Sequence, residues 1–493
     1  MPIPPSISPV RRALAALAPC VALVGCAVGP DYVKPPAPTP VAYKEMKGWK
    51  RATPLDDMPR GEWWRPFKDQ TLSGLISQVA VSNQNVAASD AAYRSAKALV
   101  REAQSSLYPT VSVAYTGTGA HNGSRTSGFS TGTATTLYTF DAGPQAAFTP
   151  DIWGKVRRAV ESDVAGAQLS AADVAEATLS AQALLAVAYY NLRASDALKD
   201  LYDRTARDYQ RTLEITERQY AAGVVSKADV ATARTQLLNT QAQAINVGVS
   251  RAQYEHAIAV LIGRPPAELD VKRAAFAVTP PGVPVALPST LLERRPDIAA
   301  AERAMQQQNA LIGVAIAAYY PDISLSAAYG FAGRGPLAVS AANELWSVAF
   351  SAAQTVFDGG LRSATVDAAR ATYDQAVATY RQTVLSAFQG VEDQLAAIRI
   401  LAQQQKVQDE AVKAAQEQVD VLLNQYTAGT VAFTAVVVAQ AQLLSNQISS
   451  LTVRQNRFLA TVQLIEALGG GWSADDLPSA QALEAAGGLV PRL

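Results

Sequence analysis

The sequence repeats itself, and this repeat limits what the chain can fold into. The stretch QYAAGVVSKADVATARTQLLNTQ (Gln219–Gln241) aligns with QYTAGTVAFTAVVVAQAQLLSNQ (Gln425–Gln447) at a shift of 206, and eleven of the 23 positions are identical. Shorter matching pairs occur at shifts of 205 to 212, in the same order in both halves. This order indicates one structural module used twice. A Pro-rich connector, Gly263–Ser289, separates the copies.

Each copy contains a very long stretch without proline, Asp151–Gly263 in the first and Leu361–Gly429 in the second. From Tyr373 onward the apolar residues recur at steps of three and four, which predicts a helix that buries one face. A single helix over Lys155–Ala222 would have 68 residues. It would be about 100 Å long, which is far more than a compact globular core needs.

A helix of this length needs partners along its whole length, because helices in water owe most of their stability to a buried face. The flanking sequence supplies shorter helical stretches in both copies. We expect long helices at Lys155–Ala222 and Leu361–Ala428, and shorter helices at Leu72–Ser106, Ser226–Ile262, Asp297–Ala318 and Thr434–Leu468. A tight turn then joins each long helix to its return helix, at 221–227 and at 427–433.

Four further stretches alternate apolar and polar residues with the period of a β-strand. They lie at about 108–117, 137–149, 320–331 and 345–356. A half-buried soluble sheet would show the same alternation, but the long polar connection at 117–136 is typical of the outer loops of outer-membrane strands. Pro144 falls inside the second stretch, which suggests a bulge or a short strand there.

Four membrane strands cannot close a barrel alone, since about eight is the smallest number known, and an open sheet edge cannot face lipid. The barrel must therefore be shared among chains. Two chains would give eight strands around a filled interior, and three would give twelve with room for a lumen. The predicted fold is mainly α with a small membrane β part, in which long-helix hairpins continue the barrel as an α-helical tube. Such an object is a conduit.

The N-terminus has the features of a lipoprotein signal. Two arginines precede an apolar segment that ends in LVGC (Leu23–Cys26). We expect cleavage before Cys26, loss of 1–25, and acylation of the new N-terminal cysteine, which would anchor the chain to the membrane. Ala27 follows instead of an aspartate, which favours the outer membrane. An ordinary secretory signal is the alternative.

Composition argues against several function classes. The formal net charge is zero and 17% of residues are charged, so nucleic acid is not an expected partner. The two histidines, His121 and His256, are far apart and have no cysteine partner, so we expect no metal site. The acidic residues form no Ser/His/Asp or paired-carboxylate pattern. We therefore expect no enzyme activity and no cofactor other than the covalent lipid on Cys26.

Nearly the whole mature chain carries motifs of a known family. They are CAVGPDYVKP (Cys26–Pro35), WWRPFKDQTLSGLI (Trp63–Ile76), DIWGKVRR (Asp151–Arg158), LLERRPDIAAAE (Leu291–Glu302), VFDGG (Val356–Gly360), YRQTVLSAFQGVEDQL (Tyr380–Leu395) and ALGGGW (Ala467–Trp472). In this order and spacing they resemble the TolC-like outer-membrane factors, in particular the lipoprotein efflux subunits of the NodT and OprM type.

The resemblance implies a homotrimer with a shared 12-stranded barrel in the outer membrane, four strands per chain, over a long periplasmic helical barrel. Such channels serve tripartite efflux pumps, in which an inner-membrane transporter, here expected to be of the RND type, drives export of small molecules. A periplasmic adaptor joins the transporter to the channel, which is itself passive. A type I protein-secretion channel and a lipid-anchored periplasmic coiled-coil scaffold are the alternatives.

The doubled stretch falls at the two turns that the resemblance places at the periplasmic tip. There the glycines can adopt the left-handed conformation that ends a helix, and the tyrosines one turn earlier can wedge between neighbouring helices. We expect the adaptor to dock around these turns and to open the channel. The expected docking residues are Tyr220, Gly223, Ser226, Lys227, Asp229, Tyr426, Gly429 and Ala432.

Two positions depart from the family pattern. Family members commonly carry an acidic residue near the second turn that narrows the pore, but Leu423 occupies that position here and Asp420 is the nearby acidic residue. Both are candidate constriction residues. Gly390 lies inside an expected helix at a cost of about 1 kcal/mol relative to alanine, which suggests a local kink or close packing.

These features divide the chain into six segments. They are a signal peptide (1–25), a lipid-anchored N-terminal segment (26–62), a first repeat (63–264), a connector (265–290), a second repeat (291–472) and a C-terminal tail (473–493). Trp63 and Trp64 open the first repeat, and we expect them to pack the N-terminal segment onto the helices instead of forming a sugar site.

Overall fold

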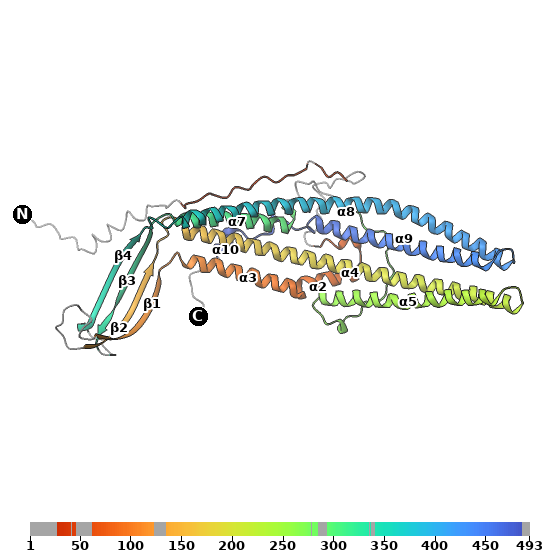
Figure 1. The fold of residues 1–493 in the computed structure, drawn as a ribbon, viewed down its shortest axis with the longest axis horizontal. Coiled ribbons are helices and arrows are strands. Elements are labelled where there is room, and N and C mark those ends of the chain that lie inside the picture. The colour runs from red at the N-terminus through yellow and green to blue at the C-terminus, as the bar shows by residue number, and fades with distance from the viewer. Residues whose placement is uncertain are drawn as a thin grey trace, which may run out of the picture.

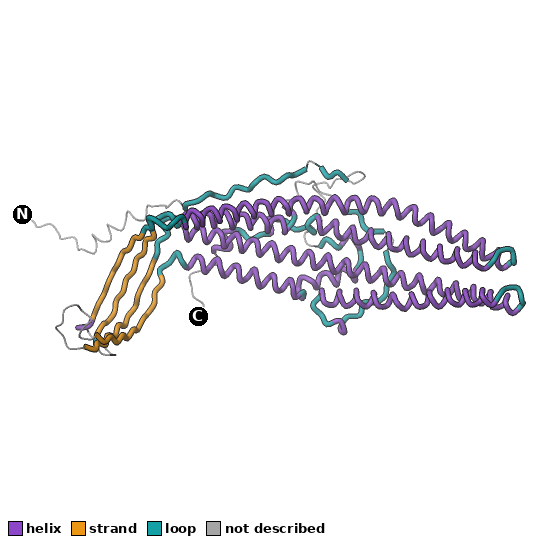
Figure 2. The backbone as a smooth tube through the Cα atoms, in the orientation of Figure 1, coloured by secondary structure: helices purple, strands orange, loops and turns teal. Residues whose placement is uncertain are grey.

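The computed structural model describes residues 27–40, 42–45, 62–122, 135–277, 279–283, 293–334, 336 and 341–485. The molecule is long and narrow, with a β-sheet at one end and the turns of two helical hairpins at the other (Figure 1). Strands and helices are segregated along the long axis, and the helices occupy most of its length (Figure 2). The sheet and the hairpin turns therefore lie at opposite ends.

The two hairpins have equal dimensions. Helices α4 (Lys155–Ala221) and α8 (Leu361–Thr427) have 67 residues each, and their return helices α5 (Lys227–Leu261) and α9 (Phe433–Ala467) have 35 each. At a rise of about 1.5 Å per residue each long helix is about 100 Å long. The predicted bounds of all four helices agree with the structure to within one residue, and the equal lengths match the internal repeat.

The remaining helices extend the same plan. Helices α3 (Gln84–Ser105) and α7 (Pro296–Ala317) have 22 residues each and correspond at a shift of 212. Helix α3 packs on α4, and α7 packs on both α4 and α8. The shorter elements are α2 (Gln70–Ser82), α10 (Ala480–Ala485), and the 3-10 turns η2 (Arg65–Phe67), η3 (Pro266–Glu268), η4 (Ala341–Asn343) and η5 (Ala474–Asp476).

The prediction of one helix over Leu72–Ser106 is wrong, because Asn83 interrupts it and separates α2 from α3. Asn83 has an extended backbone, with φ −68° and ψ 125°. Its side-chain oxygen accepts hydrogen bonds from two backbone N–H groups of the first turn of α3, at 2.9 and 3.1 Å. Its side-chain nitrogen donates to Leu261 O at 2.7 Å. The break therefore caps the start of α3 and satisfies a carbonyl at the end of α5.

The four strands form one antiparallel sheet in the order β1-β2-β3-β4. They are β1 (Thr110–Asn122), β2 (Thr135–Phe148), β3 (Asp322–Gly333) and β4 (Glu344–Ala353). All four expected strands are present, and their ends differ from the prediction by up to five residues. The inner contact of the sheet, between β2 and β3, joins the two repeats.

Pro144 does not shorten β2 or cause a bulge, in contrast to the prediction. On either side of it, Ala142 pairs with Phe331 and Gln145 pairs with Ala328 in a single register. The ladder between β2 and β3 skips Gly143 and Pro144, while on the other side Pro144 pairs with Val113 of β1 without a shift of register.

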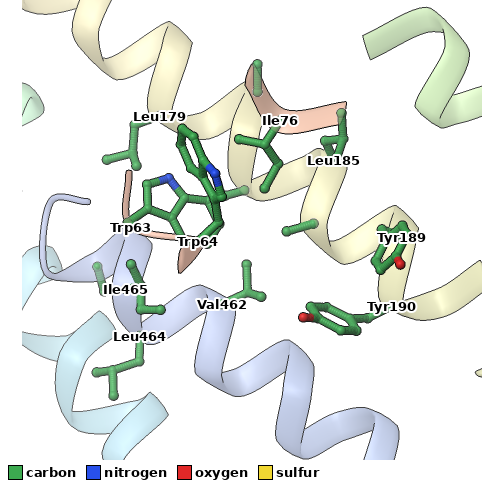
Figure 3. Close-up of a cluster of buried hydrophobic side chains, with 14 of the residues drawn as sticks. Trp63, Trp64, Ile76, Leu179, Leu185, Tyr189, Tyr190, Val462, Leu464 and Ile465 are labelled. Carbon is green, nitrogen blue, oxygen red and sulfur yellow. The ribbon is translucent and has the colours of Figure 1, made fainter. Parts of the chain in front are cut away.

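The main core lies where α4, α8 and α9 meet the N-terminal segment. Trp63 is 2% exposed and Trp64 is 6% exposed, and both pack among side chains of α4 and α9 (Figure 3). The indole nitrogen of Trp63 donates to Gln182 Oε1 at 3.1 Å. The prediction that these tryptophans pack the N-terminal segment onto the helices is confirmed.

Among the described helices, α4 alone contains a stretch long and apolar enough to cross a bilayer by composition. Less than half of that stretch is buried within the chain, at 44%. Leu185, Ala186 and Tyr189 from α4 belong to the main core. The apolar character of α4 therefore has an explanation in helix packing.

Candidate functional site: the hairpin tips and the sheet

The two hairpin turns lie beside one another at the end of the molecule away from the sheet (Figure 1). A small hydrophobic core, which we call the tip cluster, joins the two hairpins. Its buried members are Tyr209, Leu213, Ala233, Leu237, Tyr426, Phe433 and Val436. The tip cluster is separate from the main core, so the tips have their own packing.

Both turns end their long helix in the same way. Gly223 has φ 72° and Gly429 has φ 78°, in the left-handed region that favours glycine. Gly223 N donates to Tyr220 O at 2.9 Å, and the next residue's N–H donates to Gln219 O at 2.8 Å. The second turn repeats both bonds at 3.0 and 2.9 Å. This is the Schellman arrangement, and it explains why both copies carry glycine at this position.

The two return helices begin differently. Ser226 caps α5 in a reciprocal capping box with Asp229, in which Ser226 N donates to Asp229 Oδ2 at 3.0 Å. Ala432, the equivalent residue, gives α9 no side-chain cap. Lys227 is exposed, whereas its equivalent Phe433 is buried. The charged residues predicted for one hairpin therefore form its cap and its surface, and the other hairpin has an apolar contact instead.

The doubled tyrosines also differ in their surroundings. Tyr426 is 2% exposed, and its ring lies 5.3 Å from that of Phe433, centroid to centroid. Tyr220 is 47% exposed. Tyr426 therefore wedges between helices as predicted, while Tyr220 is exposed within the single chain.

Hydrogen bonds across the tip cluster form what we call the tip seam. Tyr426 Oη donates to Thr216 Oγ1 at 3.3 Å, and Gln440 Nε2 donates to Thr212 Oγ1 at 3.0 Å. Gln219 Nε2 donates to Tyr426 O at 3.4 Å. Burial raises the pKa of the Tyr426 hydroxyl, so this group stays protonated and remains a donor.

Thr212, Thr216 and Gln440 are not among the residues predicted from the sequence. The two threonines lie four residues apart on α4, so both face the same side of the helix. That spacing indicates a shared polar face on α4. It does not indicate that the face packs on the second hairpin, where Tyr426 lies 210 residues from Thr216 in the chain.

The two candidate constriction residues lie near the end of α8 in different settings. Asp420 is exposed, and Gln416 Nε2 donates to its Oδ1 at 3.0 Å. Leu423 is half-buried and packs against the tip cluster. Of the two, Asp420 is the side chain that is free to face an aqueous space, and both remain predictions.

Gly390 lies within the continuous helix α8. A Cβ added there would lie 3.9 Å from Ala467 Cβ, which is an ordinary van der Waals distance. Close packing therefore does not require glycine at this position.

At the opposite end, the sheet exposes apolar side chains along one face. Val113 is 81% exposed, and Trp346, Val348 and Phe350 of β4 are 73%, 75% and 66% exposed. Among the described residues, β1 pairs only with β2, and β4 pairs only with β3. Large exposed apolar patches mark contact with a membrane or a partner, and an edge strand with free backbone groups needs a partner strand.

Cys26 lies outside the described residues, which begin at Ala27. His121 lies on β1, where its Nδ1 is 2.8 Å from Thr136 Oγ1, and His256 is exposed on α5. The described part of the chain contains no group of three or more His, Cys, Asp or Glu side chains that could hold a metal ion.

Comparison with known proteins agrees with this architecture. The family described as outer membrane efflux protein matches residues 75–264 and 287–470, one match for each repeat. The probable efflux pump outer membrane protein TtgC of Pseudomonas putida is 30% identical over 463 residues, covering 91% of this chain and 93% of the relative. The cation efflux system protein CusC of Escherichia coli is 27% identical, covering 92% of this chain and 97% of the relative.

Among solved structures, the outer-membrane channel OprN superposes with a TM-score of 0.84 at 27% identity, covering 91% of this chain and all of the other. The repeat, the two hairpins and the four-stranded sheet therefore recur together in proteins of one kind. The chain belongs to the outer membrane efflux protein family, as an outer-membrane channel whose helices extend into the periplasm.

Proposed function

We propose that three copies of this chain form one closed barrel of twelve strands in the outer membrane, which continues as an α-helical tube through the periplasm. This proposal rests on the open edges of the sheet. Its edges β1 and β4 have no partner among the described residues, and each unpaired backbone group costs several kcal/mol in lipid. Pairing of β4 with β1 of the next copy satisfies both edges. Strands of 10 to 14 residues suit a tilted crossing of the bilayer, which needs about 9–11.

The hairpin tips support the same threefold assembly. Within one chain, the second hairpin packs on the first through Tyr426 and Phe433. The equivalent residues of the first hairpin, Tyr220 and Lys227, are exposed. The second hairpin of the next copy can pack on these exposed residues, so that six hairpins would alternate around a closed ring.

This ring is the proposed site of opening. A periplasmic adaptor would dock in the grooves between hairpins, at the residues around Gly223 and Gly429, and loosen the tip seam. An inner-membrane transporter of the RND type would supply the energy, and the channel would remain a passive conduit. Acylation of Cys26 would anchor each copy to the outer membrane.

Small molecules are the proposed cargo. Relatives are named for efflux of antibiotics, toluene, solvents and cations, so the kind of channel does not by itself select one compound. A type I secretion channel is the second candidate. It is distinguished by a protein substrate and by an ABC-type transporter partner.

Crosslinking tests the docking site. Cysteines introduced at Ser226 and Ala432, one on each kind of turn, should crosslink to the adaptor in an assembled pump. A cysteine at Val81, which is 86% exposed on α2 away from the tips, is the matched control and should not crosslink. Absence of crosslinks from both turns in an assembled pump would overturn tip docking.

Planar bilayers test the conduit itself. The purified protein should carry ionic current once the tip seam is weakened, for example by Tyr426→Ala. Protein that inserts but passes no current in either form would favour the scaffold alternative.

A further inference from the structure

The segment that follows Cys26 is bound in a fitted site on the helices. Val28 N donates to Trp153 O at 3.1 Å, at the corner where β2 gives way to α4. Asn309 of α7, which is 5% exposed, donates from Nδ2 to Pro30 O at 2.9 Å. The backbone of this segment is therefore held by α7 and by the turn that precedes α4.

Arg158 of α4 makes most of the polar contacts in this site. Its side chain is 6% exposed, and its guanidinium donates to Val28 O at 3.2 Å, to Gly29 O at 3.3 Å and to Asp31 Oδ1 at 2.8 Å. The remaining nitrogen donates to Glu161 Oε2 at 2.7 Å. Three of these four hydrogen bonds reach the N-terminal segment, two of them at backbone carbonyl groups, so the buried arginine clamps that segment.

Close backbone contacts complete the site. Gly29 has φ 98°, and a Cβ added to it would lie 2.5 Å from Gly313 Cα of α7. A Cβ added to Gly154, at the start of α4, would lie 2.6 Å from Ala27 Cα. Both glycines are needed for the segment to approach the helices this closely. We call these helix residues, Gly154, Arg158, Asn309 and Gly313, the anchor socket.

Further along, the segment continues over the helices away from the sheet (Figure 2). Lys34 Nζ pairs with Glu302 of α7 at 2.6 Å, and the Lys44 and Glu45 amides donate to Glu392 of α8 at 2.6 and 2.9 Å. Tyr43, which is 4% exposed, also packs into the main core. The socket is therefore the attachment nearest to the start of the segment.

We propose that the anchor socket fixes where the lipid on Cys26 enters the membrane. Ala27 lies in contact with Gly154, and the chain advances at most about 3.6 Å per residue. A lipid attached one residue before Ala27 would therefore start from the corner between sheet and helices. The lipid then enters the membrane at a fixed position beside the barrel wall, because the segment that carries it is held in place. This inference rests on the proposed acylation of Cys26.

Spin labelling of the full-length protein in native outer membranes tests the socket. Val33 is 77% exposed, so a label on Val33→Cys reports the mobility of the segment without entering the socket. We expect an immobile label in the parent protein. In Arg158→Met, which keeps a side chain of similar length, the released population should rise roughly tenfold or more, because several hydrogen bonds to a charged group are lost. Trimer assembly in the membrane should become slower in the same variant.

Two variants control this experiment. Gly29→Val disturbs the same site from the segment's side, so it keeps the test valid if Arg158→Met does not fold, and it should also release the label. Lys34→Met removes a contact outside the socket and should leave the label immobile and assembly unchanged. An immobile label in both socket variants, or normal assembly with a released label, would overturn the inference.

The mass of the N-terminal peptide distinguishes a failure of this inference from a failure of the proposed lipid anchor. If the parent protein carries no acyl chains, the anchor proposal fails and the role of the socket fails with it. If the acyl chains are present but the socket variants behave like the parent, the socket alone is refuted.

Discussion

Replacing Tyr426 with phenylalanine removes one hydrogen bond from the tip seam and keeps the buried ring. The lost bond joins Tyr426 Oη to Thr216 Oγ1 at 3.3 Å, which is longer than the usual 2.7–2.8 Å or so between oxygens. Its net contribution therefore lies at the low end of the usual range, about 0.5 kcal/mol. The ring contact with Phe433 remains, so the melting temperature should change little.

The proposed assembly multiplies this small effect. A trimer has three tip seams, and if they open together the closed state loses about 1.5 kcal/mol. Since about 1.4 kcal/mol corresponds to a factor of ten, the ratio of open to closed channels should rise about tenfold. Open probability in planar bilayers measures this ratio directly.

Tyr254→Phe is the matched control for this experiment. Tyr254 lies on α5, half-buried beside the main core, and belongs to neither the tip cluster nor the tip seam. It should leave the ratio nearly unchanged. An unchanged open probability in Tyr426→Phe, or equal increases in both variants, would refute the assignment of the tip seam as the closed-state lock.

Three further changes have predicted outcomes. Burial raises the pKa of the Glu176 carboxyl to about 7, with the Asp297 carboxylate adding to the effect and the Arg295 guanidinium opposing it. The folded protein therefore retains a proton that the unfolded chain releases, so stability is lost as the pH rises from about 4.5 to about 7. Burial also raises the pKa of the Glu466 carboxyl, so Glu176→Gln should reduce this loss in melting curves recorded across that range without removing it, and a pH dependence that persists unchanged would contradict it. Ala432→Ser should supply the missing cap of α9 and stabilise it by about 1 kcal/mol, seen as slower hydrogen exchange in its first turn; unchanged exchange would argue against the cap. Gly390→Ala should raise the free energy of unfolding by about 0.5–1 kcal/mol, and a destabilised variant would show that glycine is needed there.

The long helices were predictable because their signals are local and repeated. Absence of proline, spacing of apolar residues and glycine at each turn located the ends of α4, α5, α8 and α9 to within one residue. The duplication gave each signal twice. A helix end placed wrongly in one copy would have disagreed with the equivalent position in the other copy.

The errors arose where a distant segment decides the local structure. Asn83 breaks the expected helix partly because its side chain reaches a carbonyl at Leu261, which nothing in the neighbouring sequence indicates. Pro144 lies where the ladder to β3 is interrupted, opposite Tyr329 and Gly330, and the register continues unchanged on both sides of the interruption. Both outcomes depend on contacts between segments that lie more than 150 residues apart in the chain.

At the candidate site, too, contacts between distant segments decide what the local sequence does not. Tyr220 and Tyr426 lie in similar sequence, QYAAG and QYTAG, yet Tyr220 is exposed and Tyr426 is buried in the tip cluster between the two hairpins. Arg158 belongs to the quoted motif DIWGKVRR, but its role as a clamp appears only when the N-terminal segment is seen to lie against it.

A single-particle electron cryomicroscopy structure of the full-length protein in lipid would show whether the barrel is shared among chains. We predict three chains around one axis, with β4 of each chain paired to β1 of the next and the six hairpin turns in a ring at the far end. A particle with one or two chains, or three chains whose β1 and β4 edges do not meet, would contradict this prediction.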